Sequence, residues 1–358
     1  MALRSLAVME GIFSVLVYSS CSISMILLNK LIMNTYDMNY PNGILILQSG
    51  GAVAIISAAK AVKLVDYPAF SKDVARKWLP LTLMFVSMLL TSMLSLGTMS
   101  VAAQTVLKNL AVVLTALGDN FFYHKPQTPA VYSAFALMIL GSYLGAKGDQ
   151  WVTAKGLFWT FLNIIATASY TLYMRAVLGA VSSSIGRYGP VFYNNLLSLP
   201  FFLVMGFFEI APFIDAIGKA TVAGKVALTF SVLVSSAMTF GVFWCMELTS
   251  PTTLSVVGSL NKIPMTFLGM LIFNQFPQPI GYVGIAIAIG AGFLYTYLNI
   301  LANRAKAAKD KEAAEHDKAN GVTKNDIVIR VDGEEEGGKL HSHHSSSSTP
   351  NFQPSKEE

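Results

Sequence analysis

Long apolar segments alternate with short polar ones along the chain, from near Glu10 to near Leu301. Each apolar run has about 18 to 24 residues, enough for a helix to cross a hydrocarbon core about 30 Å thick. The pattern predicts ten membrane-spanning helices, at residues 10–32, 41–62, 78–97, 101–118, 129–146, 154–177, 189–210, 224–246, 251–273 and 279–301. Because the connections are mostly short, we expect any binding site to lie between the helices.

The composition supports an all-α polytopic membrane protein. Hydrophobic residues make up 53% of the chain and charged residues 13%, with a mean hydropathy of +0.54, whereas charged residues are about 25% of a soluble domain. Ten spans predict two inverted five-helix repeats, because an odd number of spans in each half inverts the second half. The segments "SLGTMSVAAQTVLKNL" and "MELTSPTTLSVVGSLNK" add weak support, since each runs from a Ser/Thr link into a span with one lysine.

The distribution of basic residues predicts the orientation in the membrane. With a cytosolic N-terminus, the cytosolic loops carry more Lys and Arg than the loops on the other side, so the positive-inside rule favours both termini in the cytosol. The two sets are Arg4, Lys60, Lys63, Lys72, Arg76, Lys77, Lys125, Arg175 and Arg187 against Lys147, Lys155, Lys219 and Lys225.

The composition changes abruptly after Leu301, to charged and small residues that cannot bury a core. We therefore expect a transmembrane domain at residues 1–302 and a disordered cytosolic tail at 303–358. His341, His343 and His344 could bind a metal, but a solvated low-complexity tract explains them better. We expect neither a metal site nor a cofactor.

Two lysines lie deep inside predicted spans. Lys108 is in the fourth span and Lys262 in the ninth, each about 12 to 17 Å from the start of its span at 1.5 Å per residue. A lysine at this depth costs about 2.5–3.5 kcal/mol, and the acidic residues lie near span ends, so an anionic ligand is the expected partner. Alternatively, each lysine snorkels or bonds carbonyl groups at a packed helix interface. Lys30, at the end of the first span, is expected to snorkel.

Two adjacent asparagines, Asn194 and Asn195, lie in the seventh span within "FYNNLLSLP". Intramembrane asparagines often join helices by hydrogen bonds. A carboxamide also matches the mixed donor and acceptor edge of a purine, and a neighbouring aromatic ring offers a stacking face. Adjacent helical residues point about 100° apart, so both asparagines reach one base edge only if the helix is locally broken, which Pro190 would allow.

These residues carry a resemblance to a known family. Phe192, Tyr193, Asn194 and Asn195 are similar to the FYNN motif of the GDP-mannose transporter family. A second motif resembles the family's GALNK, with Ser259 in place of alanine, and consists of Gly258, Ser259, Leu260, Asn261 and Lys262. "LNK", "VLKNL" and "GDQ", at residues 28–30, 106–110 and 148–150, also resemble the family, so the similarity covers all ten spans and stops at the tail.

The resemblance implies a Golgi nucleotide-sugar antiporter of the drug/metabolite transporter superfamily. Such a protein imports GDP-mannose into the lumen in exchange for GMP and performs no covalent chemistry, so the chain is not expected to be an enzyme. The FYNN-like residues would hold guanine and ribose, and the second motif the phosphate and sugar. The implied partners are GDP-mannose, GMP, the lipid bilayer and, as a further candidate, a second copy of the chain; no nucleic acid is expected.

The chain departs from the family at two positions that bear on sugar selectivity. Gln104 and Leu254, four residues before Lys108 and Gly258, stand where family members carry tyrosine. Each lies one helical turn from the expected pocket, so GDP-fucose and GDP-arabinose join GDP-mannose as expected substrates.

Three other functions fit the sequence less well. The alternative within carriers is a transporter of another organic phosphate, such as a UDP-sugar or triose phosphate, against which the asparagine pair argues. An integral-membrane transferase would need an intramembrane acid or a metal cluster, and a structural protein would not need two midplane lysines.

Overall fold

The fold is a bundle of α-helices, seen in a computed structural model that describes residues 2–123, 127–186, 188–248 and 251–319. Within these ranges the chain forms helices and their connections and no strand, which confirms the all-α prediction. The helices are α1 (Ala2–Asn34), α2 (Pro41–Ala61), α3 (Lys72–Thr98), α4 (Val101–Leu107), α5 (Asn109–Tyr123), α6 (Pro129–Lys147), α7 (Ala154–Ile185), α8 (Gly189–Met205), α9 (Phe207–Lys219), α10 (Val222–Leu248), α11 (Pro251–Leu260), α12 (Lys262–Phe273) and α13 (Pro279–Ala319).

Most of these helices are long and apolar enough to cross a membrane. Among the described residues eight spans meet that description, and nine do if α8 and α9, which meet at an angle of 93°, form one bent span. A shorter apolar segment, Val222–Met238, lies in α10. The chain is therefore a polytopic membrane protein, while the number ten stays a prediction.

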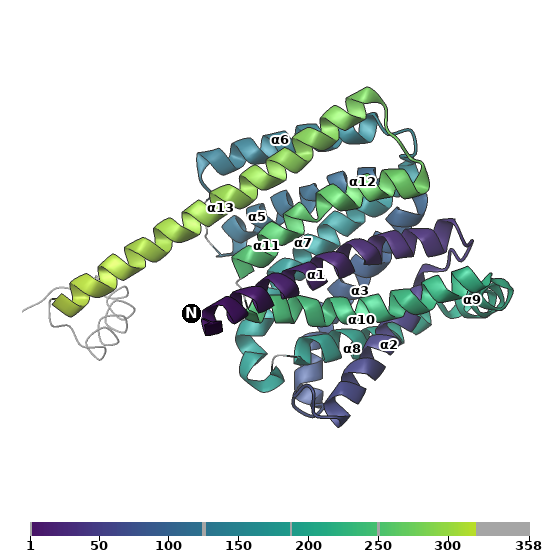
Figure 1. The fold of residues 1–358 in the computed structure, drawn as a ribbon, viewed down its shortest axis with the longest axis horizontal. Coiled ribbons are helices and arrows are strands. Elements are labelled where there is room, and N and C mark those ends of the chain that lie inside the picture. The colour runs from purple at the N-terminus through teal and green to yellow at the C-terminus, as the bar shows by residue number, and fades with distance from the viewer. Residues whose placement is uncertain (1, 124–126, 187, 249–250, 320–358) are drawn as a thin grey trace, which may run out of the picture. The chain divides into compact units, whose positions relative to one another are not determined.

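The most extensive helix contacts join the two halves of the sequence. α3 packs along α7 and α1 packs along α10, and α2 contacts both α8 and α10 (Figure 1). An inverted repeat would map α1 onto α7 and α3 onto α10, so it would exchange the two largest contacts. The pairing favours the predicted repeat, which itself stays a prediction.

Small residues let α6 approach α13 closely. A Cβ atom on Gly141 would lie 2.4 Å from the backbone nitrogen of Ala288, and one on Gly148 would lie 2.2 Å from that of Gly281. Close packing of small residues is a main source of helix association in bilayers, where the hydrophobic effect between helices is absent. α13 also packs against α4, which carries part of the site described below.

The end of the seventh predicted span differs from expectation. α8 ends at Met205 and the chain turns at Gly206, so Glu209 lies on α9 rather than near the end of a straight span. The Glu209 carboxylate accepts hydrogen bonds from the backbone N–H and the side-chain amide of Asn42, at 3.1 and 2.9 Å. A carboxylate at the start of α2 is favoured by the free N–H groups and the dipole of that helix.

The chain divides into two units, the second of which begins at Leu301. α13 continues to Ala319, so residues 303–319, expected to be disordered, are helical. The histidines at 341, 343 and 344 lie outside the described residues, and disorder there stays a prediction.

Candidate functional site

Two helices are interrupted beside the predicted lysines. Lys108 alone separates α4 from α5, and Asn261 alone separates α11 from α12, which begins with Lys262. Pro264 explains the second interruption, because proline has no N–H for the Leu260 carbonyl four residues earlier and its ring crowds that group. Each lysine therefore lies at a local irregularity of its helix, where ordinary backbone pairing is disturbed.

Lys108 is half-buried and points toward α3. Its ammonium group donates a hydrogen bond to the Ser92 hydroxyl at 2.6 Å. Gln104, one turn earlier on α4, donates from its amide to the Ser92 carbonyl at 2.8 Å and is 1% exposed. Ser92 thus holds both side chains, and the structure brings two of the predicted site residues together.

Lys262 approaches the same place from the other half of the chain. Its ammonium group donates to the side-chain oxygen of Asn109, the residue that follows Lys108. Asn109 is buried and donates to the Ala288 carbonyl on α13 at 3.3 Å, which fixes the direction of its oxygen. We call Lys108, Lys262, Ser92, Gln104 and Asn109 the lysine site.

The charges of the lysine site are only partly compensated. Lys262 bonds the residue next to Lys108, so two positive charges lie in one region of the bundle, and the hydrogen-bond acceptors given above for them are neutral oxygens. Neutral acceptors offset only part of the cost of holding an ammonium group inside a membrane. The arrangement can therefore receive an anion, such as a phosphate group.

Asn194 joins three helices. Its side-chain oxygen accepts a hydrogen bond from the Trp78 indole N–H at 2.8 Å, and its amide donates to the Tyr170 hydroxyl at 2.9 Å. Trp78 belongs to α3 and Tyr170 to α7, so the contact explains why α8 packs where these two helices meet. In this conformation Asn194 acts as the interhelical hydrogen-bonding residue that the sequence left as one of two alternatives.

Asn195 differs from its neighbour. In the described part of the chain its amide makes one hydrogen bond, to the Val191 carbonyl of its own helix at 2.9 Å. α8 runs unbroken past both asparagines, and Pro190 lies in its first turn, where the missing N–H costs nothing. A local break at Pro190 is therefore ruled out here, and the two side chains point in different directions. We call Asn194, Asn195, Trp78 and Tyr170 the asparagine cluster.

The aromatic members of the first motif pack against the connection between α2 and α3. Tyr193 is 2% exposed, its ring stacks on Phe70 with centroids 5.7 Å apart, and its hydroxyl accepts from the Ser71 N–H at 2.9 Å. The ring of Phe192 lies 5.0 Å from that of Tyr67. These contacts anchor the start of α8.

The remaining predicted residues lie along α11. A Cβ atom on Gly258 would lie 3.6 Å from the Tyr18 hydroxyl on α1, and the Ser259 hydroxyl lies 3.0 Å from that of Thr296 on α13. Asn261 is buried, and its side-chain nitrogen has no hydrogen-bond partner among the described residues. The side chain of Leu254 lies outside the described residues.

The lysine site and the asparagine cluster are separated along α3. Ser92 belongs to the lysine site and Trp78 to the asparagine cluster, and the two residues are 14 positions apart, which corresponds to about 21 Å of helix. A ligand that contacts both groups must be elongated.

Lys30 does not snorkel. It is 2% exposed, and its ammonium group donates to the carbonyls of Leu96 and Met99 at 2.7 and 2.6 Å. The prediction was wrong because the C-terminal end of α3, distant in sequence, covers this end of α1.

Sequence reasoning also missed several contact residues. Ser92, Trp78 and Tyr170 carry no motif, and their roles follow from α3 packing on α7 and α8. Asn109 follows Lys108 in "VLKNL", and this position next to a predicted site residue was the one signal in the sequence that could have identified it as part of the site.

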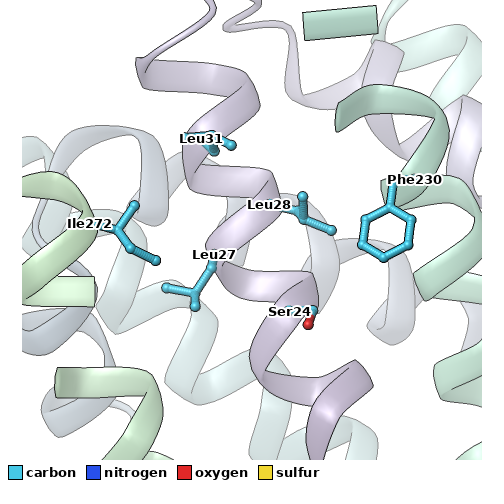
Figure 2. A pocket seen from close by; sticks show the side chains of 6 residues that line it. All are labelled: Ser24, Leu27, Leu28, Leu31, Phe230 and Ile272. Atoms are coloured by element: carbon cyan, nitrogen blue, oxygen red, sulfur yellow. The ribbon is translucent and has the colours of Figure 1, made fainter. Parts of the chain in front are cut away.

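An apolar pocket of about 220 Å³ lies between α1, α10 and α12, away from these residues. Figure 2 shows its lining, which contains one polar side chain, Ser24, and no charged group. Phosphate ligands need charged or hydrogen-bonding partners, so this pocket is not a candidate for them.

Comparison with the sequences of known proteins places this chain in a family. The model of the Triose-phosphate Transporter family matches residues 9–296. A GDP-mannose transporter of Yarrowia lipolytica is 31% identical over 84% of this chain and 97% of its own length. GDP-mannose transporter GONST1 of Arabidopsis thaliana is 33% identical over 74% of this chain and 82% of its own, and a GDP-mannose transporter of Meyerozyma guilliermondii is 29% identical over 86% and 88%. The chain therefore belongs to the Triose-phosphate Transporter family.

Proposed function

We propose that the protein is a Golgi antiporter that imports GDP-mannose into the lumen in exchange for GMP. The observation that carries the proposal is the lysine site, where two ammonium groups from opposite halves of the chain meet with neutral partners. A phosphate group supplies the missing negative charge. The curated relatives named GDP-mannose transporters support the choice of nucleotide sugar.

Asn195 is the proposed contact for the guanine base. Its neighbour Asn194 is committed to Trp78 and Tyr170, whereas the one hydrogen bond of the Asn195 amide stays within its own helix. In this proposal Asn194 and Tyr193 fix α8, and Asn195 presents the carboxamide that pairs with the base edge. A nucleotide sugar is elongated, so its base and its phosphates can reach the asparagine cluster and the lysine site together.

The sugar lies near the second motif in this proposal. Gly258 and Ser259 lie on α11, Asn261 follows that helix, and the buried Asn261 nitrogen can donate to a sugar hydroxyl or phosphate oxygen. Gln104 is held by Ser92 where the family has tyrosine, which extends the proposed substrates to GDP-fucose and GDP-arabinose. Both termini in the cytosol belong to the same proposal and rest on the distribution of basic residues.

The test is counterflow uptake in proteoliposomes. Vesicles loaded with GMP receive labelled GDP-mannose together with an excess of one unlabelled competitor: GDP-fucose, GDP-arabinose, GMP, a UDP-sugar or triose phosphate. The proposal expects competition by GDP-sugars and GMP and none by the UDP-sugar or triose phosphate. Competition by triose phosphate alone would favour the alternative carrier function and contradict the proposal.

A further inference from the structure

The C-terminal end of α3 is held by side chains from other segments. We call residues 96–100 the α3–α4 turn. A helix leaves its last four carbonyl groups without intrahelical partners. Here four successive carbonyls each accept a side-chain hydrogen bond, from Lys30 to Leu96 (2.7 Å), Asn34 to Gly97 (3.3 Å), Thr153 to Thr98 (2.9 Å) and Lys30 to Met99 (2.6 Å).

Lys30 brings a buried positive charge to this turn. It supplies two of the four bonds, and the partial negative charge at the end of α3 favours a cation there. Asp149 is 5% exposed, carries the opposite charge and also contacts this turn. Its carboxylate accepts from the Ser100 hydroxyl and from the Trp151 N–H. A buried cation and a buried carboxylate therefore both contact the α3–α4 turn.

The turn controls where α4 begins. The Ser100 hydroxyl that donates to Asp149 also accepts from the Ala103 N–H at 3.0 Å, so it caps α4. α4 has seven residues, all buried, and Lys108 follows directly. Since Ser92 lies on the other arm of this hairpin, the contact between Lys108 and Ser92 depends on the geometry of the turn.

The carbonyl groups of the α3–α4 turn do not need a charged side chain as their hydrogen-bond donor. The carbonyls of Gly97 and Thr98 are satisfied by neutral side chains, Asn34 and Thr153. Burying a lysine and an aspartate costs more than burying neutral groups and gives little net stability. The two charges can instead serve to fix one arrangement of the hairpin formed by α3 and α4.

We propose that Lys30 and Asp149 are positioning residues for phosphate binding. They touch no ligand; they hold the α3–α4 turn so that Lys108 points to the place where the phosphate is bound. The inference rests on the proposed function, and it predicts that losing either charge weakens the phosphate contact and leaves the base contact unchanged.

The experiment compares two ligands that differ in the phosphate group. GMP and guanosine are titrated by calorimetry into the purified full chain and into Lys30→Met and Asp149→Asn. Each variant should bind GMP about tenfold or more weakly, because a hydrogen bond to a charged group is disturbed, and guanosine within about twofold of wild type. Lys225→Met is the matched control, since Lys225 is exposed and also donates to a carbonyl, that of Gly218; it should leave both affinities unchanged.

A double-mutant cycle separates positioning from general damage. In a Lys108→Ala background, Lys30→Met should cause no further loss of GMP affinity, because the contact that it positions is already gone. If a single variant does not fold, Lys30→Met/Asp149→Asn removes both charges together and leaves no unpaired one; it should show the same selective loss.

Four results would contradict the inference or the proposed function, and the experiment distinguishes between them. Equal losses of GMP and guanosine affinity, or an additive effect in the Lys108→Ala background, would make Lys30 a merely structural residue. Unchanged GMP affinity in folded Lys30→Met would reject the inference alone. Wild-type protein that binds no GMP would reject the proposed function and this inference with it.

Discussion

The lysine site and the asparagine cluster both place polar groups inside the membrane, and they differ in how those groups are compensated. Asn194 pairs its oxygen with an indole N–H and its amide with a hydroxyl, so the protein itself satisfies it. Lys108 and Lys262 have neutral oxygens as the acceptors described above, and their two positive charges lie in one region of the bundle. An intramembrane polar residue whose partners leave charge uncompensated is the stronger sign of a ligand.

The largest expected effect concerns the lysine site. Lys262→Ala and Lys108→Ala should each reduce GDP-mannose counterflow by about 100-fold or more, because the buried phosphate of the ligand would lose one of its two positively charged partners. Arginine should restore little activity, since its planar fork differs from a compact ammonium group. Lys225→Ala, which removes an exposed lysine, serves as the control. Wild-type uptake by either alanine variant would exclude that lysine from the site.

The next effect tests whether the uncompensated charges enforce exchange. With the site empty, closing both sides would confine two like charges without water, at a cost of several kcal/mol, and a bound phosphate offsets that cost. A ligand shifts a conformational equilibrium only through its differential affinity for the states. Uptake of labelled GDP-mannose into empty proteoliposomes should therefore be about tenfold or more slower than into GMP-loaded ones.

Two results would contradict this explanation of exchange. One is fast uptake into empty vesicles, and the other is uptake driven by an imposed proton gradient. Either would mean that the charges of Lys108 and Lys262 are neutralised by something other than the ligand.

A smaller effect is expected at the base. Asn195→Ala should weaken GDP-mannose and GMP binding alike, by about fivefold, because a lost hydrogen bond to a neutral group is worth about 1 kcal/mol. The two ligands share the base, so their ratio should not change, and equilibrium binding to the purified protein measures both. A folded variant with unchanged GMP affinity would leave Asn195 with only its helix contact.

The smallest effect on binding is expected in the asparagine cluster, where Asn194 already has hydrogen-bond partners within the protein. Trp78→Phe keeps an aromatic ring but removes the donor to Asn194, so a buried acceptor loses its partner, at a cost of about 1 to 3 kcal/mol of stability. We expect a lower thermal unfolding temperature and a GMP affinity within about twofold of wild type. If GMP affinity fell while the unfolding temperature stayed the same, Asn194 would itself contact the ligand.

The helices and the depth of the two lysines can be predicted from the apolar segments alone. Segment length and apolarity identify membrane-spanning helices because a bilayer has a fixed thickness and every backbone group must be paired within the helix. The fixed rise per residue then places Lys108 and Lys262 well inside their spans. The structure has helices over each predicted span and brings the two lysines together.

Which polar groups are compensated depends on the packing of the helices and could not be predicted from the sequence. Lys30 lies 66 and 69 residues from the carbonyls that it bonds, and Asn194 lies 116 residues from Trp78. Such partners depend on which helices pack together and on their rotation about their axes. In a long apolar span the periodicity of the sequence gives little information on that rotation. For the same reason the sequence left two possible roles for Asn194 and predicted wrongly that Lys30 snorkels. Whether a buried polar or charged group is paired is a property of the packed helices and not of any single helix.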